Sequence, residues 1–203
     1  MKLTIHPLFL ILLFFIILYG NIALYSIIIS SLLFHEFGHY MAAKLVGAKI
    51  DRCVIVPYGG EMTIKNESFL TYNQLTVIAL GGPIASALGM LIAFGLPENY
   101  FEPFFYMNFL LLLVNLIPIW PLDGGRLLCY RLLIIKPKIK VYEMYLSVSF
   151  YLLTLIIIVV LYLLPQSLSF AVLSLFLWSK VIGEWRVRKY RFAFEKLVMN
   201  RLT

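Results

Sequence analysis

Long apolar stretches separated by short polar breaks are the dominant pattern along this 203-residue chain. Six of them predict membrane helices, because about 20 apolar residues are needed to cross a bilayer. Residues that favour turns, such as Gly20-Asn21 and Lys136-Pro137-Lys138, mark breaks between the stretches. The predicted helices cover Pro7–Tyr19, Ile22–Val46, Leu75–Leu96, Pro103–Ile117, Tyr142–Leu164 and Ser167–Gly183.

The segment Ile50–Phe69, between the second and third predicted helices, has a different pattern. Two short β-prone runs flank the sequence Pro57-Tyr58-Gly59-Gly60, which predicts a β-hairpin. The segment is too short and too polar to cross a bilayer, yet apolar enough to dip into one. We therefore predict an all-α integral membrane protein with about six transmembrane helices and a membrane-associated β-hairpin.

Small residues are concentrated in the third predicted helix. Gly81, Gly82, Ala85, Ser86 and Gly89 lie within nine positions of one another. Small side chains let helix backbones approach closely in a membrane. We expect them to pack the third helix against the second.

The composition supports a membrane protein. Hydrophobic residues make up 62% of the chain and charged residues 13%, which is unlike an ordinary soluble domain. We expect one polytopic domain, residues 1–185, and a short basic cytosolic tail, residues 186–203. The first apolar stretch lacks a small-residue cleavage site, so we interpret it as a retained helix. Cys53 and Cys129 form no recognisable disulfide framework, and we expect reduced thiols.

The distribution of charge predicts the orientation in the membrane. With six helices, every Lys and Arg falls on the side of the two termini or at the helix ends of that side. The opposite loops carry Glu98 and Glu102 and no Lys or Arg. The positive-inside rule then places both termini in the cytosol. This topology accounts for the net charge of +7, so we expect anionic lipid, and no nucleic acid, as a partner.

The candidate chemistry lies in the second predicted helix, where residues 35–39 read His-Glu-Phe-Gly-His. His35 and His39 share one helix face, so both imidazoles can reach one metal ion. Glu36 directly follows the first histidine, where a carboxylate can take a proton from water. The uncharged run Ile22–Phe34 precedes the motif, and ionisable groups at membrane depth are usually functional. A chance match, or polar side chains satisfied within a helix bundle, is the alternative interpretation.

A catalytic zinc ion usually has three protein ligands, and three residues are candidates for the third position. Asp123 follows Pro118 and Pro121 at the end of an apolar helix. The two prolines would break the helix, and a membrane tolerates such a break only where the chain lines a cavity. The alternative role of Asp123 is an ordinary Asp-Gly turn. Cys129 offers a soft ligand but lies in a more regular apolar stretch, and His6 is interpreted as an interfacial residue near the amino end.

Two further features are candidates for substrate binding. Asn115 is an uncharged polar residue among Leu and Val, and it could bond a neighbouring helix or hold the substrate carbonyl or the attacking water. The hairpin, with Pro57, Tyr58, Gly59 and Gly60 at its turn, could pair with an extended substrate or simply cover the loop. Both alternatives stay open for each feature.

The pair of motifs, His-Glu-x-x-His in one helix and Asn-x-x-Pro…Asp-Gly in a later one, resembles the site-2 protease family of intramembrane zinc proteases. The Pro-Tyr-Gly-Gly turn and the stretch Asn115–Gly125 are similar to the sporulation branch of that family. The resemblance implies one zinc ion held by His35, His39 and Asp123, with Glu36 as catalytic base. It also implies cleavage of a membrane-associated sigma-factor precursor (pro-sigma-K) in the bacterial mother-cell membrane around the forespore, under control of inhibitory membrane partner proteins.

Members of this branch commonly carry a C-terminal nucleotide-sensing CBS domain. The chain continues for only about twenty residues after the last predicted helix, so we expect neither a CBS nor a PDZ domain. Energy sensing through ATP is therefore in doubt for this chain.

Two other functions fit parts of the sequence. A metal-ion transporter could line its path with His and Asp, but it does not need Glu36 beside the first ligand, and the chain has no inverted repeat. An inactive regulatory scaffold would be expected to lack one of the ligands or the glutamate. All four residues are present.

Overall fold

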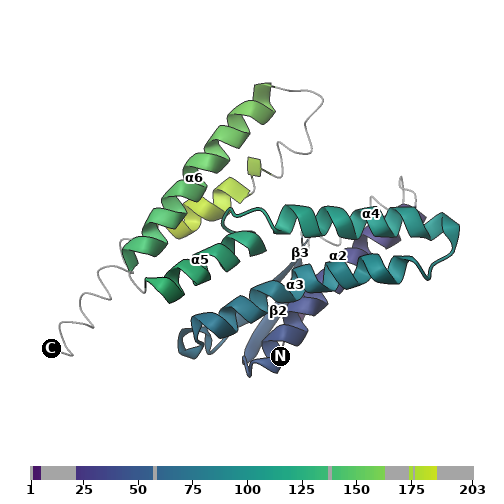
Figure 1. Cartoon of the computed structure of the whole chain (residues 1–203), viewed down its shortest axis with the longest axis horizontal. Helices are drawn as coiled ribbons and strands as arrows, with labels where there is room; N and C mark the ends of the chain where they lie inside the picture. The colour runs from purple at the N-terminus through teal and green to yellow at the C-terminus, as the bar shows by residue number, and fades with distance from the viewer. Residues whose placement is uncertain are drawn as a thin grey trace. The chain divides into compact units, whose positions relative to one another are not determined.

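The computed structural model describes residues 2–5, 22–56, 59–136, 139–162, 174–175 and 177–186. The chain divides into two compact units, Met1–Ile117 and Pro118–Thr203, which are described separately. The described residues are mostly helical, as predicted, and their elements are labelled in Figure 1. The predicted first helix and His6 lie outside the described residues.

Three helices form the larger part of the first unit: α2 (Ile22–Leu45), α3 (Tyr72–Ala93) and α4 (Glu98–Asn115). Helix α2 packs against α3 and α4, and α3 packs against α4. These helices confirm the second, third and fourth predicted helices to within a few residues. A short 3-10 helix, Glu67–Phe69, precedes α3.

The ends of α2 and α3 follow from local hydrogen bonding. Helix α2 ends at Leu45, and Gly47 just after it has a φ of 77°, which suits a residue without a Cβ atom. Thr71 and Gln74 form a reciprocal capping box that starts α3. The Gln74 side chain also donates to the carbonyl of Val46 at 3.2 Å, which ties the start of α3 to the end of α2.

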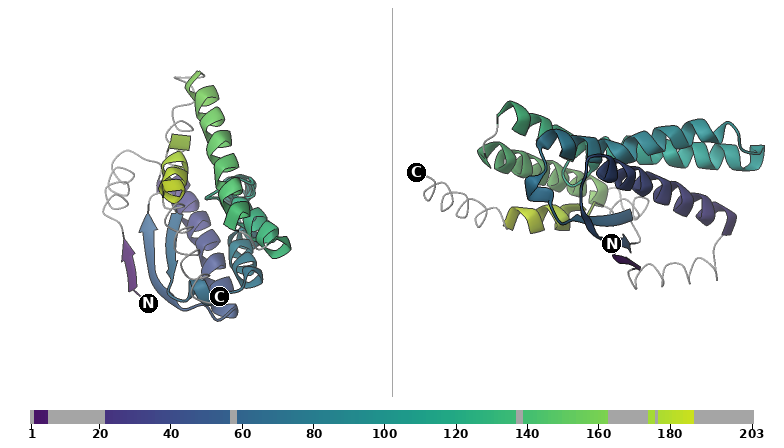
Figure 2. Two further views of the ribbon diagram at one scale, coloured as in Figure 1. Left: turned by 90° about the vertical axis from the view of Figure 1, so that its left-hand side faces the viewer. Right: turned by 90° about the horizontal axis from the view of Figure 1, so that it is seen from below.

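The first unit also contains a small sheet with the strand order β1-β2-β3. Its strands are β1 (Lys2–Ile5), β2 (Ile50–Val56) and β3 (Gly59–Ile64). Strands β2 and β3 are antiparallel, which confirms the hairpin, and β1 pairs in parallel with β2 (Figure 2). The sequence did not predict β1, because four residues are too few to show a clear alternation. The hairpin is therefore part of a three-stranded sheet, and its strand β3 contacts α2.

Helices α2 and α3 cross with their backbones in close contact. A Cβ atom on Gly38 would lie 2.2 Å from the carbonyl oxygen of Gly81, and one on Gly81 would lie 2.4 Å from the carbonyl oxygen of Gly38. Only glycine fits at both positions, since real Cβ atoms do not approach other atoms so closely. The expected packing role of the small residues in α3 is confirmed.

The second unit contains α5 (Asp123–Ile135), α6 (Ile139–Tyr162) and helical residues among 174–186. Helix α6 confirms the fifth predicted helix, and the sixth is described only in part. Helix α5 was not predicted. Its apolar residues are interrupted by Arg126 and Arg131, so the segment shows no membrane-length apolar run.

Two of the described helices are long and apolar enough to cross a membrane by length and composition, Tyr72–Ala93 and Lys140–Tyr162. Many apolar side chains of α6 face outward, including Leu155 at 59% and Ile158 at 60% exposed. An exposed apolar surface of this kind is typical of a lipid-facing helix.

Candidate metal centre

The histidines of the candidate site lie one turn apart on α2. The centroids of the His35 and His39 rings are 5.0 Å apart, and the ring planes are nearly perpendicular, at 81°. His35 is buried, with 2% of its surface exposed, while His39 is partly buried. Their spacing on one face of the helix agrees with the H-E-x-x-H prediction.

Helix α3 fixes the orientation of the His39 ring. Its Nδ1 atom lies 2.8 Å from the carbonyl oxygen of Ile78. Because a carbonyl can only accept a hydrogen bond, Nδ1 must carry the proton, and Nε2 keeps its lone pair for a metal. The amide of Gly82, 3.3 Å from the same Nδ1, therefore cannot donate to it in this tautomer.

The His35 ring has a comparable partner on the same helix. Its Nδ1 lies 2.8 Å from the hydroxyl oxygen of Ser86, which is fully buried. If Nδ1 donates this bond, Nε2 is the atom of His35 that would bind a metal, as in His39. Metal-binding histidines usually have such a second partner, which fixes the tautomer and the ring orientation.

Gly82 lies beside the metal-binding atoms of both rings. A Cβ atom on Gly82 would lie 2.3 Å from Nε2 of His39 and 2.5 Å from Nε2 of His35. Any larger residue would therefore occupy the space next to both nitrogens. Glycine at this position therefore avoids a steric conflict with both nitrogens and with a metal ion that they would bind.

Glu36 lies on α2 between the two histidines and is partly buried. It is close enough to β2 for its charge to act on Cys53: burial, and then the negative charge of Glu36, raise the pKa of the Cys53 thiol. The sheet is therefore near the residue expected to act as a base.

Asp123 is the first residue of α5 and is buried, with 6% of its surface exposed. The chain turns just before it, where the amide of Leu122 donates to the carbonyl of Ile119 at 3.0 Å. Gly125 packs directly on this turn, since a Cβ atom there would lie 2.4 Å from the carbonyl oxygen of Ile119. The tight turn is therefore Ile119–Leu122, and the Asp-Gly-Gly sequence after it forms the first turn of α5.

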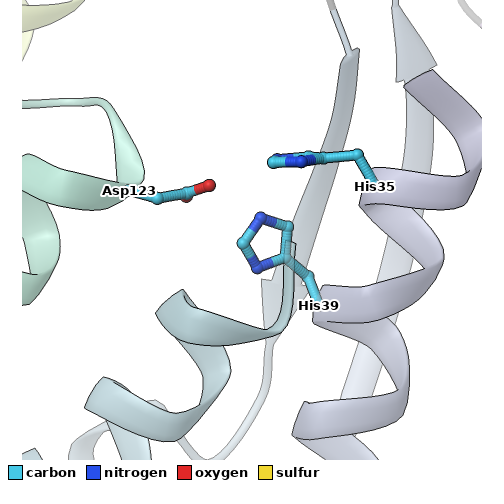
Figure 3. A group of neighbouring side chains, drawn as sticks. All are labelled: His35, His39 and Asp123. Carbon is cyan, nitrogen blue, oxygen red and sulfur yellow. The ribbon is translucent and has the colours of Figure 1, made fainter. Parts of the chain in front are cut away.

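His35, His39 and Asp123 form a group that could hold a metal ion, with one ligand atom from each within 4.8 Å of the others (Figure 3). Two imidazoles and a carboxylate are a donor set that catalytic zinc uses in other proteases. The residues present therefore fit the metal that the sequence predicts.

The other candidate residues have different surroundings. Cys129 is a free, fully buried thiol that packs with Leu133 and Tyr145, and Cys53 is also free, as expected for reduced cysteines. The Asn115 amide donates to the carbonyl of Leu111 in its own helix at 3.0 Å. Gly59 and Gly60 begin β3, whereas Pro57 and Tyr58 lie outside the described residues.

Sequence reasoning missed the residues of α3 that contact the two rings. Ser86 and Gly82 were expected only to allow close helix packing, and Ile78 was not considered. Their positions four residues apart along α3 put them on one face, and this spacing was the one available signal. This spacing shows that the three residues share a face of α3, but it does not show that this face contacts the histidines.

Comparison with known proteins agrees with the geometry. Residues 60–160 match the model of Peptidase family M50. The chain belongs to this family, that of the site-2 proteases. The matched residues begin after the H-E-x-x-H motif and include Asp123.

Individual relatives extend the match to most of the chain. Stage IV sporulation protein FB of Bacillus subtilis is 29% identical over 97% of this chain and 71% of its own length. Zinc metalloprotease MJ0392 of Methanocaldococcus jannaschii is 30% identical, over 52% of this chain and 33% of its own length. The structure of the site-2 protease from Methanocaldococcus jannaschii matches with a TM-score of 0.67 and 25% identity, covering 92% of this chain and 93% of that one. This M50 protein is therefore a zinc metalloprotease.

Proposed function

We propose that this M50 protein is an intramembrane protease that cleaves a membrane-associated protein precursor near the cytosolic face of a bacterial membrane. The observation that carries the proposal is that α3 contacts the Nδ1 atoms of both histidines, which makes Nε2 the proposed zinc-binding atom of each ring. Asp123 is the proposed third ligand, and Glu36 is the proposed base.

Zinc, when bound, acts as a Lewis acid that polarises the scissile carbonyl and lowers the pKa of water. Glu36 would take a proton from the attacking water and pass it to the nitrogen of the leaving amine. His35 and Asp123 are both buried, with 2% and 6% of their surface exposed. Asn115 is a proposed contact for the substrate carbonyl, although its amide also bonds its own helix.

The sheet supports a role in holding the substrate. A helical peptide has its backbone hydrogen bonds satisfied, so it must unwind before a peptide bond is exposed. Strand β2 is paired on both sides, whereas β3 lies at an edge of the sheet and contacts α2. We propose that the unwound substrate adds to β3 at this edge of the described sheet, a common way to bind an extended peptide.

The similarity to stage IV sporulation protein FB supports a specific substrate. We propose that the protein removes the pro-sequence of a sporulation sigma factor, pro-sigma-K, in the membrane around the forespore. Inhibitory membrane proteins are the proposed regulators, and anionic lipid is the proposed partner of the basic tail.

Co-expression with pro-sigma-K tests this proposal. The unaltered chain should produce a shorter sigma factor, and the Glu36→Gln variant, expressed to the same level, should not. A precursor that stays intact with both proteins would contradict the assigned substrate. Metal uptake by vesicles that contain the protein would instead favour the transporter.

A further inference from the structure

Two hydroxyl groups of α6 hold the backbone that precedes Asp123. The amide of Trp120 donates to Oγ of Ser149 at 3.2 Å, and the Tyr145 hydroxyl donates to the carbonyl of Pro118 at 2.8 Å. Both side chains are buried, Tyr145 with 5% and Ser149 with 1% of its surface exposed. They are four residues apart, so they project from one face of α6.

This backbone segment needs such partners because it belongs to no helix. It precedes α5, and Pro118 and Pro121 have no amide hydrogen to contribute to a regular ladder. Buried backbone groups without a hydrogen bond are costly, so the carbonyl and the amide must be satisfied by side chains. Tyr145 supplies a donor to the Pro118 carbonyl, and Ser149 supplies an acceptor to the Trp120 amide.

The segment is also anchored by its own side chains. Ile119 is buried in a cluster with Leu153 and Val181. The Trp120 ring meets the Tyr142 ring edge-on at 5.9 Å between centroids, and the Arg126 guanidinium lies 5.7 Å from the Trp120 centroid. These contacts fix the segment along its length, while the two hydroxyls fix its polar backbone groups.

The first turn of α5 rests directly on this segment. A Cβ atom on Gly125 would lie 2.4 Å from the carbonyl oxygen of Ile119 and 2.6 Å from the amide nitrogen of Trp120. Asp123 is two residues from Gly125 in the same turn. A shift of the Pro118–Trp120 backbone would therefore move the Asp123 carboxylate as well.

We propose that Tyr145 and Ser149 are positioning residues that set the Asp123 carboxylate for zinc binding. The inference rests on the proposed role of Asp123 as a zinc ligand. It gives α6 a part in the metal site although α6 itself contributes no ligand.

The test measures zinc affinity of the full-length protein in detergent, by competition with a chelator. Tyr145→Phe and Ser149→Ala should each weaken zinc binding about tenfold, the usual effect of losing a partner that orients a ligand. Ser149→Thr keeps a hydroxyl and should restore most of the affinity. The absorption spectrum of the Co²⁺-substituted protein should change in the two weakened variants, because the geometry of the carboxylate ligand changes.

Two residues of the same helix provide matched controls. Ser147 bonds the carbonyl of Glu143 within α6 at 2.9 Å, and Tyr151 is 70% exposed. Ser147→Ala and Tyr151→Phe should leave both the zinc affinity and the Co²⁺ spectrum unchanged. Thermal unfolding of the metal-free proteins checks folding, and the Ser149→Ala and Ser149→Thr pair carries the test if Tyr145→Phe does not fold.

Unchanged affinity and spectrum in Ser149→Ala would overturn the positioning role, as would equal losses in the two controls. Asp123→Asn, measured in parallel, separates this failure from a failure of the proposed function. If Asp123→Asn binds zinc as tightly as the unaltered protein, the assigned ligand set is wrong.

Discussion

At the residue scale, groups on α3 orient the rings of the two candidate histidines of α2. His35, Glu36 and His39 follow from a local spacing that any helix converts into one face. The contacts of Ser86 and Ile78 with the two rings depend on how α2 and α3 cross. No spacing within a single helix contains that information, so these partners required the structure.

The close approach of Gly82 to the two Nε2 atoms leads to a prediction about this residue. Gly82→Ala should abolish zinc binding, because its Cβ atom would lie 2.3 and 2.5 Å from the two nitrogens. Zinc per chain in the purified protein measures the effect. Gly95→Ala is the matched control, since the atom nearest to its Cβ would be 3.5 Å away. Normal zinc content in Gly82→Ala would show that the metal lies elsewhere.

The third ligand is tested by a pair of substitutions in α5. Asp123→Asn should reduce zinc retention about 10-fold or more, because a neutral amide replaces the carboxylate ligand. Cys129→Ser should leave zinc retention nearly unchanged, since this thiol packs with Leu133 and Tyr145. Chelator competition on both purified variants gives the comparison. The reverse order of effects would identify Cys129 as the ligand.

At the element scale, the long apolar helices were predictable and the short elements were not. A long run of apolar residues, which is typical of a membrane helix and of few other elements, occurs in α2, α3, α4 and α6. Helix α5 carries two arginines among its apolar residues, and β1 has four residues, so neither gives a clear period. The parallel pairing of β1 with β2 joins residues 50 positions apart, as in Lys2 with Arg52, which no local pattern reveals.

The strand order changes what the hairpin should do. Because β2 is central, an added substrate strand should meet β3 and not β2. In a background with Cys53→Ser and Cys129→Ser, cysteines at Met62, Thr63 and Ile64 should crosslink to cysteines flanking the scissile bond. Efficiency should alternate, since successive side chains of a strand face opposite ways.

A cysteine at Val54 of β2 is the control for this experiment and should crosslink much less. Proline scanned through β3 should impair cleavage without releasing zinc, because it disturbs backbone pairing and leaves the ligands in place. Strong crosslinks from β2 alone, or proline tolerated throughout β3, would show that the hairpin is only a cover.

At the scale of the whole molecule, the predicted topology places the loop before α3 in the cytosol and the loop between α3 and α4 outside it. Lys65 is exposed in the first of these loops, and Asn99 is exposed in the first turn of α4, next to the second loop. In intact cells of a cysteine-free background, a membrane-impermeant maleimide should label Asn99→Cys. It should label Lys65→Cys only after lysis. Labelling of Lys65→Cys in intact cells would reverse the proposed orientation.

Glu36 is proposed to supply the base while other residues hold the zinc. Zinc content and precursor cleavage, measured in the same purified preparation of Glu36→Gln, separate these two roles. Glu36→Gln should bind as much zinc as the unaltered protein and give no cleaved product, because the ligands remain and the base is lost. Cleavage by the zinc-loaded Glu36→Gln protein would show that Glu36 is not the base.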